Sequence, residues 1–230
     1  MPATTLTRLG RLALDLLYPP ACALCGRGGP LLCATCRESL PAADGPRCSR
    51  CWLPLTHGYC RPCQAIPLAL AGLRSAFRFE GSARELVHGF KFGDLSSLAQ
   101  VMAPVMACVV DWRPDTVVPV PLSGSRERQR GYNQAALLAK GIAGELGVPV
   151  AGALKRTRSS RPQALSSSAE ERRRNVQGAF AVRIPNAVEG RDVLLVDDVA
   201  TTGATLDACA CALLEAGARE VSAVTFARED

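Results

Sequence analysis

Two adjacent carboxylates and the small polar loop that follows them are the residues best suited to chemistry in this sequence. Asp197 and Asp198 precede the stretch Ala200–Thr205, which reads ATTGAT. Small residues let backbone N–H groups approach an anion, and threonine hydroxyls donate further hydrogen bonds. The carboxylates repel a phosphate, but they can accept hydrogen bonds from the neighbouring hydroxyls of a sugar or meet a hydrated Mg²⁺. A ribose 5-phosphate satisfies both groups, with its phosphate in the loop and its diol at the aspartates.

Eight of the eleven cysteines form a second constellation of four CxxC pairs. The pairs are Cys22 with Cys25, Cys33 with Cys36, Cys48 with Cys51, and Cys60 with Cys63. Each pair can present two thiolates to one ion, and a structural Zn²⁺ takes four such ligands in a tetrahedron. We expect two structural zinc ions. The simplest assignment places one on the first two pairs and one on the last two, and a cross-brace pairing of alternate pairs stays open.

Arginines that follow a short strand form a candidate diphosphate site. The apolar pair 117–118 reads as a buried strand, and the run VPLS leads from it to Arg126 and Arg130. Guanidinium groups bind phosphates through paired hydrogen bonds, and a rigid proline turn helps to hold them at the end of the strand. We therefore expect Arg126 and Arg130 to contact a diphosphate, the alternative being a solvated basic face. Lys91, or an arginine of the polar segment 155–176, could also cross the site.

The surrounding sequence predicts the elements that position these residues. Val193–Val196 is a continuous apolar run of the kind found in a buried parallel strand. A helical pattern over Leu206–Leu214 follows the loop and stops at Gly217, and Glu220–Phe226 reads as the next strand. In open α/β sheets, ligands bind at the carboxyl ends of strands, where this loop lies. The sequence therefore predicts an α/β domain with a parallel sheet.

Length and composition are consistent with one such domain and a small extra module. The chain has 230 residues and a net charge of +6, and we divide it into an N-terminal amphipathic helix (1–20), a cysteine-rich segment (21–66) and the α/β domain (71–230). The N-terminus has no secretory apolar core, and cysteines in CxxC pairs are typical of metal sites in a reducing compartment, so we expect a cytoplasmic protein. The helix is too short to span a bilayer; docking on its own protein is expected, with peripheral membrane association as the alternative.

The cysteine-rich segment has too few apolar residues for a core of its own. Metal binding is therefore expected to supply its folding energy. Its role is open between bracing the neighbouring domain and binding a partner.

Val193–Thr205, read as VLLVDDVATTGAT, resembles the phosphoribosyl pyrophosphate (PRPP) motif of type I phosphoribosyltransferases. The resemblance implies that Asp197 and Asp198 hold the ribose hydroxyls at the catalytic centre, with Mg²⁺ accompanying PRPP. It also implies that the 5-phosphate is wrapped by Ala200, Thr201, Thr202, Gly203, Ala204 and Thr205. Purine-salvage relatives often place an acidic residue two positions before the glycine of the motif. Thr201 stands there in this chain, so the acceptor of the phosphoribosyl group stays unidentified.

A more specific resemblance covers almost the whole chain. The runs VPVPLS, RGYNQ, RPQALS and RRNVQGAF, behind a CxxC-rich head and ahead of the PRPP motif, are similar to those of the ComF family (GntX-like). The resemblance implies a double zinc ribbon followed by a phosphoribosyltransferase fold, with helices on both faces of the sheet. That family is associated with DNA uptake in natural transformation. Single-stranded DNA and the helicase or translocation proteins of competence are the partners that this association implies.

Two functions from different classes follow from these observations. One is an enzyme that transfers phosphoribosyl from PRPP to an unknown acceptor and releases pyrophosphate. The other is a non-catalytic PRPP- or nucleotide-binding component of the competence machinery, which contacts single-stranded DNA or proteins through its zinc ribbons. A third, a zinc-ribbon nucleic-acid binder with a vestigial domain, has less support. The polar segment 155–176 is expected to be a lid, because PRPP chemistry must be kept from water.

Overall fold

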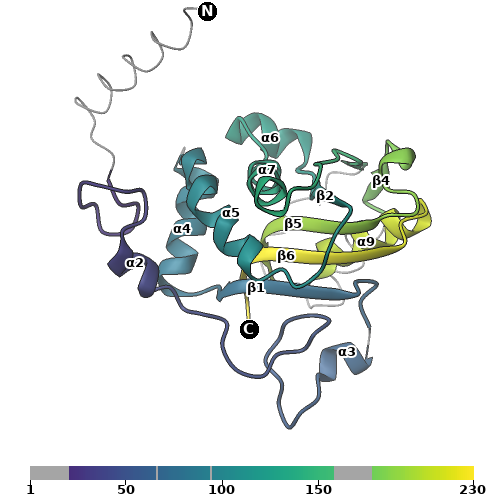
Figure 1. The fold of residues 1–230 in the computed structure, drawn as a ribbon, viewed down its shortest axis with the longest axis horizontal. Coiled ribbons are helices and arrows are strands. Elements are labelled where there is room, and N and C mark those ends of the chain that lie inside the picture. Colours follow the sequence, from purple (N-terminus) through teal and green to yellow (C-terminus); the bar gives the residue numbers. More distant parts are fainter. Residues whose placement is uncertain (1–20, 66, 94, 158–177) are drawn as a thin grey trace, which may run out of the picture. The chain divides into compact units, whose positions relative to one another are not determined.

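The structure, a computed structural model, describes residues 21–65, 67–93, 95–157 and 178–230 (Figure 1). The helix predicted over 1–20 and nearly all of the predicted lid lie outside these ranges. The chain divides into two compact units, Met1–Leu40 and Pro41–Asp230. The boundary between them falls inside the cysteine-rich segment, so the first four CxxC cysteines belong to one unit and the last four to the other.

The described elements are few in the first unit and follow an α/β order in the second. The first unit holds α2 (Ala34–Glu38). The second unit contains, in order, α3 (Arg61–Ala65), β1 (Gly72–Arg78), α4 (Gly81–Phe92), η1 (Ser96–Leu98), α5 (Ala99–Cys108), β2 (Thr116–Pro119), α6 (Gly124–Arg130), α7 (Gln134–Leu146), β3 (Leu154–Arg156), β4 (Phe180–Val182), η2 (Pro185–Ala187), β5 (Asp192–Ala200), α9 (Ala204–Glu215) and β6 (Glu220–Arg228).

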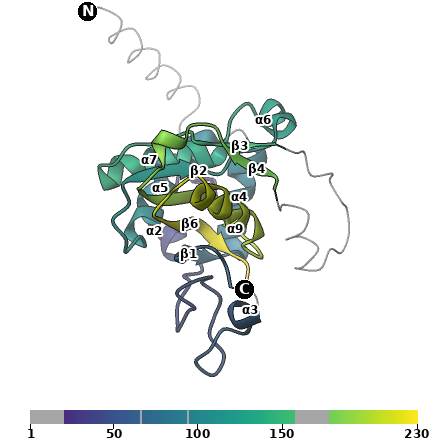
Figure 2. The same ribbon diagram turned by 90° about the vertical axis from the view of Figure 1, so that its right-hand side faces the viewer.

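A four-stranded parallel sheet in the order β1-β6-β5-β2 forms the centre of the second unit. Helices α5 and α7 pack on one side of the sheet and α9 on the other (Figures 1 and 2). The apolar run Val193–Val196 is buried throughout because helices cover both faces of its strand. The predicted fold class, a parallel sheet with helices on both faces, is confirmed.

Strand β5 is longer than its apolar run predicted. It continues through the two aspartates to Ala200, and Asp197 is paired with Thr225 of β6. The apolar pattern in the sequence ends at the two aspartates, but the backbone pairing of β5 with β6 continues beyond them to Ala200. Asp197 and Asp198 therefore lie near the carboxyl end of β5.

The segment 41–49 covers the outer edge of β1. Ala42 forms an antiparallel bridge with Phe77, and the backbone N–H of Arg78 donates to the carbonyl of Pro41 at 2.8 Å. Further along, the N–H of Leu73 donates to the carbonyl of Ser49 at 3.3 Å. An exposed strand edge can pair with other chains, so this cover closes one side of the sheet.

A small antiparallel pair, β3 and β4, lies apart from the main sheet and packs on α9. Strand β4 follows the polar segment 155–176 in the chain. Strand β3 contains Lys155 and Arg156, the first residues of the predicted lid. Their pairing partners, Ala181 and Phe180, are distant in sequence, which explains why periodicity alone did not reveal this strand.

Candidate functional site

The loop predicted to hold a phosphate connects the end of β5 to the first turn of α9. Gly203 is the N-cap of α9 and has φ of 77°, a left-handed conformation that residues with a Cβ rarely adopt. Because glycine has no side chain, it leaves the first amides of the helix available to an anion. The N–H of Ala204 donates to the hydroxyl of Thr202 at 3.3 Å. The remaining loop residues are exposed (Thr201), half-buried (Thr205) or buried (Ala200).

The two aspartates lie immediately before this loop and repel one another. Oδ1 of Asp197 accepts the backbone N–H of Asp198 at 2.9 Å. Burial, followed by the negative charge of Asp198, raises the pKa of Asp197 to about 7, although Lys91 and Arg130 oppose the shift. The site therefore favours a bound cation or hydroxyl groups that donate to these oxygens.

Lys91 reaches this acidic pair from the last turn of α4. Its Nζ lies 2.6 Å from Oδ1 of Asp198, whose side chain is 8% exposed. The hydroxyl of Tyr132 donates to the carbonyl of Phe90 at 2.7 Å and so holds the end of α4 against the turn between α6 and α7. Lys91 therefore contacts Asp198 of β5, and the residue before Lys91 is held by the turn between α6 and α7.

Arg130, the last residue of α6, lies close enough to both aspartates to interact electrostatically with them. Its guanidinium lies 4.8 Å from the ring centroid of Phe92 and donates to Oε1 of Gln134 at 3.1 Å. Burial lowers the pKa of Arg130, and the charge of Asp198 opposes this effect. Arg126 is exposed, and its charge further lowers the pKa of Arg130. The structure thus brings Lys91 into contact with Asp198 and Arg130 near both aspartates, and Arg126 lies near Arg130.

Two further polar residues belong to this region: Arg156, from the segment 155–176 in which an arginine was expected to cross the site, and Gln134, for which the sequence indicated no role. Arg156 of β3 lies 5.3 Å from the ring centroid of Phe180; burial and then Arg126 lower its pKa, and Asp197 opposes them. Nε2 of Gln134 is the one buried side-chain polar atom without a partner in the described part of the chain. Gln134 is the first residue of α7, directly after the N-cap Asn133, and nothing in the spacing of the sequence indicated that it would contact Arg130.

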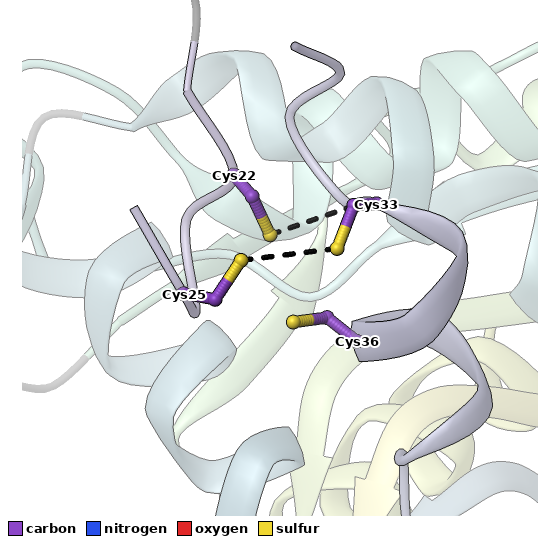
Figure 3. A group of neighbouring side chains, drawn as sticks. All are labelled: Cys22, Cys25, Cys33 and Cys36. Carbon is purple, nitrogen blue, oxygen red and sulfur yellow. Dashed lines mark hydrogen bonds between the residues drawn. The ribbon is translucent and has the colours of Figure 1, made fainter. Parts of the chain in front are cut away.

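The first four cysteines come together in the first unit, where their side chains point toward one another (Figure 3). The Sγ atoms of Cys22, Cys25, Cys33 and Cys36 all lie within 4.8 Å of one another. The sulfur atoms of Cys25 and Cys33 are 3.8 Å apart. Four thiolates about 2.3 Å from a tetrahedral zinc ion stand about 3.8 Å apart, so the arrangement fits Zn²⁺.

The last four cysteines repeat this arrangement in the second unit. The Sγ atoms of Cys48, Cys51, Cys60 and Cys63 also lie within 4.8 Å of one another. Cys48 and Cys63 are 3.8 Å apart, and Cys51 and Cys60 are 3.5 Å apart. In both units, therefore, the structure groups cysteines that are consecutive in sequence.

The thiols of the first set do not ionise together without a cation. Burial opposes ionisation of Cys22, but hydrogen bonds from backbone amides outweigh it and lower the pKa of this thiol to about 6. Hydrogen bonding to Cys33, with burial and the other thiols, raises the pKa of Cys36 to about 12. A divalent cation at the centre removes this conflict by stabilising all four thiolates.

No helix in the described ranges combines the length and the apolar character needed to cross a membrane.

Comparison with known proteins identifies both parts of the chain. Residues 132–230 match the phosphoribosyl transferase domain, and residues 13–66 match the double zinc ribbon domain. The zinc ribbon match and the two cysteine sets together indicate that the chain binds zinc.

Relatives in bacteria match over most of their length. The chain is 32% identical to the "DNA utilization protein YhgH" of Escherichia coli strain K12 over 223 residues, covering 90% of this chain and 96% of that protein. It is 31% identical to "Competence protein ComFC" of Bacillus subtilis over 213 residues, covering 86% and 84%. A solved structure described as the allosteric regulatory enzyme of purine biosynthesis is 25% identical over 56% of this chain and 25% of that one, with a TM-score of 0.41. The chain therefore belongs to the ComF family, whose members join a double zinc ribbon to a phosphoribosyltransferase-like domain.

Proposed function

We propose that this protein binds PRPP with Mg²⁺ and transfers its phosphoribosyl group to an acceptor, releasing pyrophosphate, as part of DNA uptake. The observation that carries the proposal is the order of functional groups at the end of β5, carboxylates first and then a loop of backbone amides. Asp197 and Asp198 are followed within a few residues by a glycine-capped loop at the start of α9. A sugar phosphate needs acceptors for its hydroxyls and donors for its phosphate at this separation.

The surrounding cations suit the other end of PRPP. Lys91 contacts Asp198, Arg130 lies near both aspartates, and Arg126 is exposed near Arg130. We assign the 5-phosphate to Ala200–Thr205 and the pyrophosphate to these cations. Lys91 must then exchange its contact with Asp198 for one with the ligand, which links ligand binding to a change at the acidic pair.

The proposed reaction is a substitution at the anomeric carbon of the ribose. A lone pair of the acceptor forms a bond to that carbon while the bond from carbon to the pyrophosphate oxygen breaks, and the bonding electrons leave with pyrophosphate. Positive charge builds up on the sugar and negative charge on the leaving group. Arg130 and Lys91 would stabilise the leaving group, and the two carboxylates would orient the sugar. Bound Mg²⁺ would supply further charge neutralisation for the diphosphate.

A matched pair of variants of β5 tests the assignment. Asp198→Asn should weaken PRPP binding by about 100-fold, because it removes a carboxylate that would accept charge-assisted hydrogen bonds from the ribose hydroxyls. Asp192→Asn, at the other end of the same strand, should leave binding unchanged; there Asp192 pairs with Arg219 at 2.6 Å, far from the loop. Binding is measured by calorimetry and turnover by release of pyrophosphate. Equal binding by the two variants would contradict the proposal.

A second candidate function is a PRPP- or nucleotide-binding protein without turnover, which contacts single-stranded DNA or a protein partner through its zinc ribbons. One observation favours it: a groove of about 460 Å³ on the second cysteine segment, whose lining includes His57, Tyr59 and Arg61. Tyr59 is 39% exposed. Exposed aromatic rings and a guanidinium are the groups on which unpaired bases stack.

The two candidates make different predictions for the same protein preparation. Tight PRPP binding without pyrophosphate release, together with salt-dependent binding of single-stranded DNA that Tyr59→Ala weakens, would favour the second. Steady release of pyrophosphate that Asp198→Asn abolishes would favour the first.

A further inference from the structure

The second cysteine set is connected to the start of the phosphate loop through a buried arginine. Arg228, the last residue of β6, is 1% exposed. Its Nε donates to the carbonyl of Cys51 at 2.9 Å, and its Nη1 donates to the carbonyl of Ala200 at 3.1 Å. The same Ala200 carbonyl accepts the N–H of Glu229 at 2.9 Å. One guanidinium therefore joins Cys51, a candidate metal ligand, to Ala200, the first residue of the loop.

A second connection runs from the same cysteine pair to the end of the loop. Arg50, which lies between Cys48 and Cys51, donates from Nη1 to the carbonyl of Leu68 at 3.2 Å. The next residue, Ala69, donates its N–H to Oδ1 of Asp207 at 2.6 Å. Asp207 is in the first turn of α9, the helix that begins directly after the loop.

The side chain of Leu68 also closes the space beside the loop glycine. A Cβ built on Gly203 would lie 3.5 Å from Cδ1 of Leu68. Gly203 already has a left-handed backbone, so the segment after the second cysteine set packs against the most constrained residue of the loop. Two adjacent residues of one metal knuckle, Arg50 and Cys51, thus lead to the two ends of one loop.

We propose that Arg228 and Arg50 are positioning residues through which the second cysteine set, when it holds its metal, fixes the conformation of the phosphate loop. The metal fixes the backbone of Cys48–Cys51, and groups that hydrogen-bond to a metal-ligand segment are known to orient such sites. A knuckle without metal can move, and the carbonyl of Cys51 then no longer fixes Arg228. The metal site and the phosphate site become coupled, and the coupling acts in both directions.

The first cysteine set provides the internal control. It has the same ligand types but belongs to the other compact unit. In the zinc-loaded full-length chain, Cys63→Ser removes a ligand from the second set and Cys36→Ser removes one from the first. Amide hydrogen exchange of a peptide covering residues 200–207 should become about 5-fold faster or more in Cys63→Ser, and should stay within about 2-fold of wild type in Cys36→Ser. Equal rates in the two variants would overturn the proposal.

A second pair of variants tests the connection with both metals in place, in case Cys63→Ser does not fold. Asp207→Ala removes the acceptor of the Ala69 N–H, whereas Asp207→Asn keeps an oxygen at that position. Loop exchange should rise in Asp207→Ala and return toward the wild-type rate in Asp207→Asn, with two zinc ions per chain in both. Arg50→Met, a change at an exposed side chain, should also raise loop exchange. Unchanged exchange in both Asp207→Ala and Arg50→Met would overturn the proposal.

Coupling in the reverse direction is measured by zinc loss to a chelator. PRPP with Mg²⁺ should slow the loss of one of the two zinc ions by about 5-fold or more, and Arg228→Gln should remove this protection. This arm rests on the proposed PRPP site, whereas the exchange arms use no ligand. Absence of PRPP binding with intact exchange effects would therefore contradict the proposed function alone. PRPP binding without any exchange effect would contradict the coupling alone.

Discussion

The two cysteine sets have the same ligands but very different surroundings. In each, one CxxC pair leads into a short helix, α2 after Cys33 and α3 after Cys60. The first set lies in a unit whose one described helix has no buried residue. In the second set, Cys51 and Cys60 are part of the same apolar cluster as the sheet residues Leu195 and Val221.

This difference teaches that a ligand pattern defines a metal site but not its consequence. The first set organises its own short segment, because few apolar contacts are available to do so. The second set is a component of the sheet domain. It is connected to the domain core by packing and to the phosphate loop by Arg228. Losing the same ion should therefore have different effects at the two places.

The largest expected effect is on the stability of the second unit, Pro41–Asp230, which contains the sheet. Cys63→Ser should lower its free energy of unfolding by about 3–5 kcal/mol, because loss of the metal also loosens core packing. Cys36→Ser should change it by less than about 0.5 kcal/mol. Both tryptophans of the chain, Trp52 and Trp112, lie in the second unit, so urea titrations followed by tryptophan fluorescence report on that unit. Equal losses in the two variants would break the comparison.

A smaller effect, a gain in stability, is expected when the acidic pair is altered. The repulsion and burial of its two carboxylates lower the free energy of unfolding of the second unit. The pKa of Asp197 is raised to about 7 in the folded protein. The stabilising contribution of its protonated form is therefore complete below about pH 4, declines as pH rises and is lost above about pH 7. Asp197→Asn should thus raise the free energy of unfolding by about 2 kcal/mol at pH 8.

The gain in Asp197→Asn should shrink at pH 5.5, when each variant is compared with wild type at the same pH so that changes in zinc affinity cancel. A gain that is independent of pH would show that the carboxyl is not the cause. The same variant should lose PRPP binding, so stability and function would oppose each other at this residue.

The attachment of the second set to β1 should contribute about 1 kcal/mol. The guanidinium of Arg74 lies between two indole rings, 4.7 Å from the centroid of Trp52 and 4.5 Å from that of Trp112. Arg74→Met should lower the free energy of unfolding of the sheet unit by about this amount and alter tryptophan emission. The control is Arg84→Met, which removes a longer contact to Phe79 at 5.9 Å. Equal losses of unfolding free energy in the two variants would show that stacking of Arg74 between the two indole rings adds no stability beyond that of the longer contact.

The smallest effect is expected at the amino end of β5. Asp192→Asn removes an exposed ion pair with Arg219 and should cost about 0.5 kcal/mol or less. Because water and salt screen exposed pairs, this loss should disappear at high ionic strength. A cost above about 2 kcal/mol would show that this end of the strand is more than a neutral control.

Local patterns in the sequence predicted most of the central fold. The apolar strand Val193–Val196, the helix over Leu206–Leu214 and the strand Glu220–Phe226 are determined by neighbouring residues, and all three are present. What the sequence did not reveal depends on distant partners. The extension of β5 requires the ladder with β6, and β3 requires β4.

The same distinction applies to the candidate site. The acidic pair and the glycine loop are contiguous, so their composition was informative. The contact of Lys91 with Asp198 joins residues more than 100 positions apart. No local pattern predicted it; Lys91 was proposed only because a diphosphate site needs cations. Arg156, Gln134 and Arg228 act through contacts that no local pattern encodes.

The most direct test of the account is a calorimetric titration of the full-length, zinc-loaded protein with PRPP in the presence of Mg²⁺. We expect saturable binding of one PRPP per chain, retained in Asp192→Asn and about 100-fold weaker in Asp198→Asn. A wild-type protein that carries both zinc ions and yet shows no saturable binding of PRPP would contradict the central claim.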